Sequence, residues 1–137
     1  MMKTLIDTSF VVALINKKDE DHEKALELSF NFNRKPTIIT DAVLLEIGNS
    51  LSRHFKKECV ETIEGFFESE EVEVIRLDES LFNKAFELYK IHADKTWGLV
   101  DCISFVVMKE QNITDALTGD KHFTQAGFRA LMLDLTN

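Results

Sequence analysis

Four acidic side chains in separate segments of the sequence have contexts suited to metal chemistry. They are Asp7, Glu46, Asp101 and Asp120. Carboxylates brought close together repel one another unless a cation is present, and oxygen ligands suit hard divalent ions such as Mg²⁺ and Mn²⁺. Such ions polarise phosphoryl oxygens and lower the pKa of bound water, so displacement at phosphorus is the chemistry that they favour.

Motifs for other common chemistries are absent from the sequence. The four histidines show no ligand spacing such as HExxH, and the chain has no GxGxxG, GxxxxGK[ST] or GxSxG motif. The two cysteines form no CxxC pair and are too few for a disulfide scaffold, so we expect Cys102 to be a buried thiol. The acidic residues therefore remain the main candidates for chemistry.

Asp101 lies in the stretch GLVDCISFVVM, where its neighbours are small or apolar. A stretch that is apolar on all sides predicts a central helix. An ionised carboxylate buried without a partner is costly. We therefore expect Asp101 to lie in the first turn of that helix, at an open edge of the fold.

Length and composition predict one globular domain over residues 1–137. The net charge of −8 counts against nucleic-acid binding, because phosphate contacts come from lysine and arginine. Local basic clusters survive nevertheless at Lys17-Lys18, Arg34-Lys35, Arg53-His54-Phe55-Lys56-Lys57 and Lys121-His122. No apolar run is long enough to span a membrane and the N-terminus lacks signal-peptide features, so the expected location is the cytoplasm.

Hydrophobic periodicity predicts strands that alternate with helices. The expected strands are 3–6, 37–40, 72–77, 113–117 and 129–133, and the expected helices are 9–16, 19–32, 41–55, 59–68, 78–89, 98–108 and 120–125. Thr8 or Ser9, Asp41 and Asp78 are the expected N-caps, and Gly127 is expected to end the last helix. The pattern predicts an α/β fold whose mostly parallel sheet is covered by helices on both faces.

Ligands of open parallel sheets bind beyond the carboxyl ends of the strands. Asp7 and Asp120 follow predicted strands, Glu46 lies one turn into a helix and Asp101 lies in the first turn of another. A doubly wound sheet can therefore bring all four to one edge. Each acid also has a structural explanation. Asp7 and Asp120 could cap helices, Asp101 could interact with its helix dipole, and Glu46 could be solvated.

Four segments in this order resemble the PIN domain family, and most closely its VapC-type toxins of toxin–antitoxin modules. They are IDTSFVVAL, TDAVLLEIGNSL, WGLVDCISFVVM and ALTGDKHFTQAGF, and the resemblance extends over essentially the whole chain. It implies a flavodoxin-like three-layer α/β/α sandwich and an endoribonuclease dependent on Mg²⁺ or Mn²⁺. Cleavage would leave 5′-phosphate and 3′-hydroxyl ends.

The resemblance also implies roles for particular residues. Asp7 and Asp101 would be the principal metal ligands, with Glu46 and Asp120 completing the catalytic pocket. Hydroxyl groups that match those of the family, and that would hold water or phosphate or else cap helices, are Thr8, Ser9 and Thr118. The sequence departs from the family where many relatives carry a hydroxyl residue before the third acid, because Val100 stands there.

The implied partners are an RNA substrate, a protein antitoxin and a second copy of the chain. Phe66, Phe67 and Phe82 are candidates for a homodimer surface, although most phenylalanines pack in cores. Two other hypotheses remain open: a non-catalytic PIN-like scaffold that binds a protein, and a receiver-type phosphoryl-transfer domain. The second lacks support because Asp7-Thr8-Ser9 has no second acid of a DxD motif.

Overall fold

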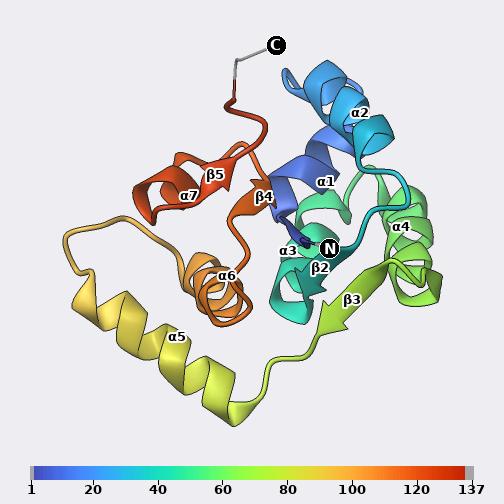
Figure 1. Cartoon of the computed structure of the whole chain (residues 1–137). Helices are drawn as coiled ribbons and strands as arrows, with labels where there is room; N and C mark the ends of the chain where they lie inside the picture. Colours follow the sequence, from blue (N-terminus) through green and yellow to red (C-terminus); the bar gives the residue numbers. More distant parts are fainter. Residues whose placement is uncertain (1, 135–137) are drawn as a thin grey trace.

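A five-stranded sheet forms the centre of the computed structural model, which describes residues 2–134 (Figure 1). Its strands are β1 (Thr4–Ile6), β2 (Thr37–Thr40), β3 (Val72–Ile75), β4 (Asp115–Leu117) and β5 (Arg129–Ala130). Their order in the sheet is β3-β2-β1-β4-β5, and every pairing is parallel. The carboxyl ends of these strands therefore meet at one edge of the sheet.

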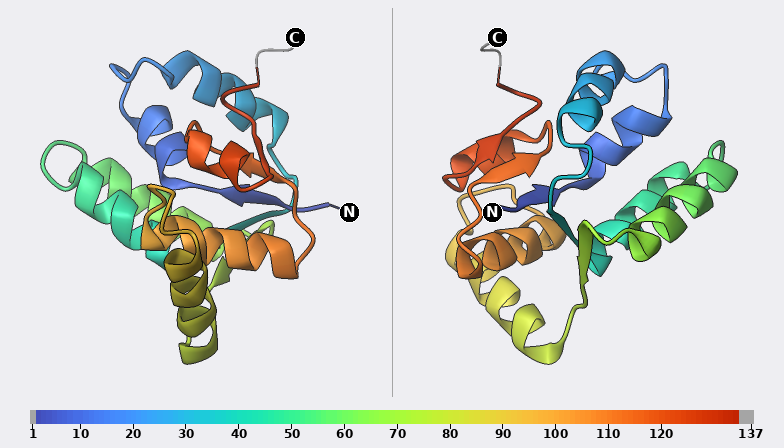
Figure 2. Two further views of the ribbon diagram at one scale, coloured as in Figure 1. Left: turned by 90° about the vertical axis from the view of Figure 1, so that its left-hand side faces the viewer. Right: turned by 45° about the vertical axis from the view of Figure 1, so that its right-hand side comes forward.

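Helices cover both faces of the sheet, which confirms the predicted three-layer fold (Figure 2). They are α1 (Thr8–Ile15), α2 (His22–Asn31), α3 (Asp41–Leu51), α4 (Lys56–Glu68), α5 (Glu79–Ile91), α6 (Leu99–Glu110) and α7 (Lys121–Gln125). Leu5 and Ile38 point into a core shared with α5, α6 and α7, whereas Ile6 and Ile39 point into a core shared with α1 to α4. This alternation places a hydrophobic core on each face.

Helix α6 is central, as the sequence predicts. Cys102 and Met108 are fully buried, and Phe105 makes edge-on contacts with Trp97 and Phe123, whose ring centroids lie 5.1 and 4.9 Å away. These contacts join α6 to α7 and to the loop before α6, so burial fixes the first turn of α6 at the sheet edge. No helix within the described residues is long and apolar enough to cross a membrane.

The helix caps differ in part from the prediction. Asp78 caps α5 as predicted, since its carboxylate accepts from the Leu81 N–H. Asp41 does not cap α3: the Thr40 hydroxyl accepts from the Val43 N–H, and Asp41 accepts instead from the Leu77 N–H.

The predicted cap of the first helix is also wrong. Thr8 and Ser9 lie inside α1, and Asp7 occupies its N-cap position without a side-chain capping bond. All three side chains point their polar groups toward residues outside α1, because tertiary hydrogen bonds replace local ones there.

Several element boundaries also differ from the prediction by two to four residues. Helix α3 ends at Leu51 and α4 begins at Lys56, with a turn between them. Strand β5 has only two residues. The Leu131 N–H still donates to the Ala116 carbonyl of β4, but the Leu133 N–H donates to the Ala130 carbonyl, so the chain turns there and the strand ends. Gly127 follows α7 with φ of +94°, the left-handed conformation expected of a glycine that ends a helix.

Candidate active site

An open cleft of about 380 Å³ lies at the edge where the parallel strands end, and all four predicted acids line it. Its lining consists of Asp7, Thr8, Ser9, Val12, Asp19, Asp21, Glu46, Asp101 and Asp120. None of these lining residues is a lysine or an arginine. The cleft therefore concentrates negative charge that can be balanced by a bound cation.

Asp7 is the most deeply buried of these acids, with 4% of its surface exposed. The Thr118 hydroxyl donates to Asp7 Oδ2 over 2.7 Å, which uses the only proton that this hydroxyl carries. Ser9, whose Oγ is 3.1 Å from Thr118 Oγ1, must therefore donate to it. The Ser9 oxygen in turn accepts from the Gly119 N–H over 2.9 Å, and Thr118 accepts from the Asp120 N–H over 3.1 Å.

This directed chain of hydrogen bonds ties β1, α1 and the loop after β4 to one carboxylate. Burial raises the pKa of Asp7 from its ordinary value of 3.8 to about 7. The hydrogen bond from Thr118 and the backbone of Thr8 act in the opposite direction, while the charges of Asp101 and Asp120 raise the pKa further. Near neutral pH, the charged form of Asp7 is therefore poorly stabilised by the protein alone.

Glu46 is held by Thr8, the first residue of α1. The Thr8 hydroxyl donates to Glu46 Oε1 over 2.6 Å and so joins α1 to α3. Thr8, Ser9 and Thr118, which the sequence offered as ligand-binding hydroxyls, are thus engaged with one another or with the acids. Thr118 is fully buried and lies beneath the cleft rather than in its wall.

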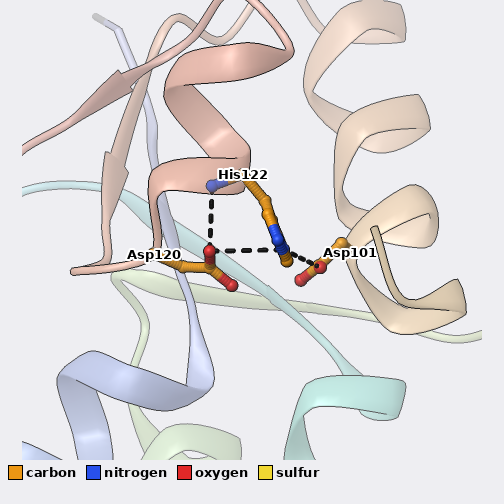
Figure 3. Close-up of side chains that lie close together, drawn as sticks. All are labelled: Asp101, Asp120 and His122. Atoms are coloured by element: carbon orange, nitrogen blue, oxygen red, sulfur yellow. Dashed lines mark hydrogen bonds and ion pairs between the residues drawn. The ribbon is translucent and has the colours of Figure 1, made fainter. Parts of the chain in front are cut away.

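Asp101 points from the first turn of α6 toward the cleft, with 16% of its side chain exposed (Figure 3). Its Oδ2 atom accepts from the Gly98 N–H over 3.1 Å and lies 3.0 Å from His122 Nδ1. Both contacts reach the same oxygen, and within residues 2–134 no hydrogen bond reaches Oδ1. Asp101 is therefore held in orientation while one oxygen stays available for a ligand.

His122 lies between two of the acids (Figure 3). Its Nδ1 atom is 3.3 Å from Asp120 Oδ1 as well as 3.0 Å from Asp101 Oδ2. An N–H at Nδ1 can donate to these carboxylate oxygens, which accept hydrogen bonds. The Nε2 atom lies 3.1 Å from the Thr96 hydroxyl, which fixes the far side of the ring. Asp120 also accepts from the His122 N–H and so caps α7, which was the structural explanation for this acid.

Sequence reasoning missed three residues of this site. His122 was assigned only to a basic cluster, although its position two residues after Asp120 placed it within reach of that acid. Asp19 and Asp21 were missed because they lie in a loop that only folding brings to the cleft. Among the described residues, only Asp101, Asp120 and His122 bring potential ligand atoms within 4.8 Å of one another, so Asp7 and Glu46 are not part of that tight group.

The departure at Val100 has a structural counterpart. Val100 packs against both hydrophobic cores and offers no hydrogen bond to the acid that follows it. Gly98 and His122 provide that support for Asp101 instead, from the loop before α6 and from α7.

Stability of the metal-free protein should fall as pH rises, because the pKa of Asp7 is higher in the folded than in the unfolded chain. The stabilisation is complete below about pH 4 and is lost as pH passes through 7. Between pH 5 and pH 8.5 the loss should be about 3 kcal/mol. Urea unfolding in EDTA measures this loss of stability. The variant Asp7→Asn keeps an acceptor for the hydrogen bond from Thr118 and should abolish the pH dependence. Parallel pH profiles for the two proteins would contradict the buried, protonated carboxyl.

Comparison with known proteins identifies the family. The model of the PIN domain matches residues 4–129. The 23S rRNA-specific endonuclease VapC20 of Mycobacterium tuberculosis, from strains CDC 1551 / Oshkosh and H37Rv, is 30% identical over 125 residues, which cover 90% of this chain and 93% of the relative.

The fold agrees with that match. The crystal structure of M. tuberculosis VapC20, described as a sarcin-ricin loop cleaving toxin, superposes with a TM-score of 0.82 at 27% identity, over 91% of this chain and 95% of that one. The sequence match and the structural match both extend over nearly the whole chain. The chain therefore belongs to the PIN domain family.

Proposed function

We propose that this protein is a metal-dependent endoribonuclease and the toxin of a type II toxin–antitoxin module. The observation that carries the proposal is the cleft in which Asp7, Glu46, Asp101 and Asp120 meet at the carboxyl edge of the sheet. The similarity to a 23S rRNA-specific endonuclease supports RNA as the substrate and makes ribosomal RNA the first target to test. A ribosomal target would place the protein in the cytoplasm.

The donor set fits a hard divalent cation. The cleft offers carboxylate oxygens and no lining lysine or arginine, and Asp101 Oδ1 accepts no hydrogen bond within the described residues. Carboxylate and water ligands suit Mg²⁺ and Mn²⁺ better than a closed zinc site of cysteine and histidine. When bound there, such an ion would lower the pKa of a water nucleophile and stabilise charge on a phosphodiester.

The protein's own residues would hold and orient the ligands. Thr118 fixes one oxygen of Asp7, Thr8 fixes one oxygen of Glu46, and His122 fixes Asp101. Asp7 must give up the proton that burial favours before its carboxylate can serve as a ligand. In-line hydrolysis of RNA at such a site would leave 5′-phosphate and 3′-hydroxyl ends.

A non-catalytic PIN-like scaffold is the alternative. The acidic residues speak against it, since six carboxylates in one cleft repel one another and only some of them, such as Asp120 at the N-cap of α7, have a structural role. A calorimetric titration that detects no divalent cation bound at the cleft would favour the scaffold.

RNA cleavage should require both the ion and the acids. The purified protein should cleave ribosomal RNA with Mn²⁺ or Mg²⁺ and stop in EDTA. Asp7→Asn and Asp101→Asn should each lower the cleavage rate by more than about 100-fold, beyond the loss expected when only an outer-shell partner is removed. Asp94→Asn removes the same charge at a side chain that is 71% exposed and should cleave normally. Full activity in EDTA, or in both folded cleft variants, would overturn the proposal.

His122 should act by positioning the acids. His122→Ala should weaken Mn²⁺ binding by about 10- to 100-fold, the range typical of outer-shell partners. His122→Asn places an amide N–H near the position of Nδ1 and should keep most of the affinity. Electron paramagnetic resonance of free Mn²⁺ gives the dissociation constant without an activity assay. Equal affinity in the wild type and the alanine variant would show that Asp101 needs no such support.

We also propose that a second copy of the chain packs on α5. Phe82, Phe86 and Tyr89 recur at helical spacing on α5 and are 40–45% exposed, with ring centroids 6.1 and 6.4 Å apart. Of the phenylalanines suggested by the sequence, Phe66 instead packs against a core. A homodimer and a protein antitoxin are the partners expected of a VapC-type toxin.

Phe86→Glu should convert a dimer to a monomer, because a charge would be buried in an apolar interface. Light scattering after size-exclusion chromatography measures the mass, which should halve. Glu87→Lys changes charge on a neighbouring face of α5 and should leave the mass unchanged. A wild-type protein that is already monomeric would refute this interface.

A further inference from the structure

Two basic segments that are far apart in the sequence meet beside the acidic cleft. Lys17 and Lys18 follow α1, and His54 lies in the turn between α3 and α4. Together they line a groove of about 670 Å³, whose other lining residues are Ile15, Asn16, Phe55 and Glu58. The two loops that carry these side chains lie next to each other in both views of Figure 2. We call this hollow the basic groove.

The basic groove continues the acidic cleft. On α1, Val12 lines the cleft and Ile15, three residues later, lines the groove. In the loop that follows, Lys18 lines the groove and its neighbour Asp19 lines the cleft. At a helical rise of about 1.5 Å per residue, Ile15 at the end of α1 lies roughly 10 Å along the helix from Thr8, which lines the cleft, and Lys17 follows two residues later. That span suits a few nucleotides of an extended strand.

The charge of the groove is opposite to that of the cleft. Lys17, Lys18 and His54 are exposed, and within residues 2–134 none of them forms an ion pair with an acid. Exposed cations that flank the groove in sequence are Arg53, Lys56 and Lys57, and Glu58 is the one acid in its lining. In a chain of net charge −8 this is a local concentration of positive charge next to the carboxylates.

The groove also has an apolar surface. Ile15 and Phe55 are half-buried, pack against the core beneath α1 and α3, and expose the rest of their side chains to the groove. Proteins that hold single-stranded RNA combine cations for the phosphates with apolar or aromatic surface for the bases. The basic groove has both features.

The basic cluster Arg34-Lys35 lies in a different place. Arg34 and Lys35 precede β2 and line a separate pocket with Thr37 and Val72, at the amino ends of the strands. They are therefore on the opposite edge of the sheet from the acidic cleft. Their charge matches that of Lys17 and Lys18, which makes them a suitable control.

We propose that the basic groove binds the RNA strand on one side of the phosphodiester that enters the acidic cleft. This deepens the proposed function and rests on it. Lys17 and Lys18 bind backbone phosphates, while Ile15 and Phe55 contact a base or ribose. The groove supplies attraction that the cleft cannot, because carboxylates without a cation repel phosphate.

The test compares Lys17→Gln/Lys18→Gln with Arg34→Gln/Lys35→Gln, which removes the same charge at the opposite edge. Fluorescence anisotropy with a labelled sarcin–ricin RNA hairpin, in EDTA and across a range of salt, measures binding without cleavage. The groove variant should bind roughly tenfold more weakly, and its plot of log K against log salt should be shallower by about 1.4, the value for two lost contacts to single-stranded phosphates. The control should match the wild type.

Each outcome bears on a different proposal. If the wild type binds RNA through the groove but cleaves none with Mn²⁺, the ribonuclease proposal fails and the groove stands. If the wild type cleaves while the groove variant keeps its affinity and salt slope, the groove proposal is overturned. An equal loss in both double variants would also overturn it, as a general charge effect. Unchanged RNA binding with lost affinity for a poly-glutamate peptide would assign the groove to an acidic protein partner and overturn it too.

Discussion

The hydrogen bond from Thr118 to Asp7 connects the two strands on which the candidate site is built. It joins the carboxyl end of β1 to the residue after β4, across neighbouring parallel strands. Ser9, Gly119 and the Asp120 N–H extend it into a chain of hydrogen bonds. Because Asp7 is almost fully buried, losing this bond would remove the side-chain donor of a carboxyl group in a low-dielectric environment. The positions of α1 and α7 depend on the same atoms.

A second constraint is the repulsion among the acids. Six carboxylates line one cleft, and the fold holds them there with donors placed behind them rather than with lysine or arginine. Thr8, Thr118, Gly98 and His122 each occupy one oxygen of an acid. This arrangement leaves the negative charge of the cleft without a balancing lysine or arginine in its lining, as a site for a divalent cation requires. It also explains how Asp101 is oriented although Val100 cannot hydrogen-bond to it.

Charge is divided along the exposed edge of the molecule. Acids gather where the strands end, and cations gather on the loops that follow α1 and α3, at the far ends of these helices. The net charge of −8 hides this separation, since it averages over both regions. A polyanion that is repelled by the cleft alone can be attracted by the neighbouring groove, so local rather than total charge governs such binding.

Much of the fold was determined by the sequence itself. Period-2 and period-3.6 patterns, the helix end at Gly127 and the apolar run around Phe105 suffice to predict the order of strands and helices, because these signals act over a few residues. The four acids were also found from their positions after strands and at helix starts. The caps of α1 and α3 were not, because Thr8, Ser9 and Asp41 form tertiary rather than local hydrogen bonds.

Only the tertiary structure decided which side chains complete the site. His122 lies between Asp101 and Asp120 because α7 packs against α6, and Asp19 and Asp21 reach the cleft because the loop after α1 folds back over it. The meeting of Lys17 and Lys18 with His54 has the same origin. These residues are distant in sequence, and the packing of helices on a parallel sheet brings them together, which no local pattern of residues encodes.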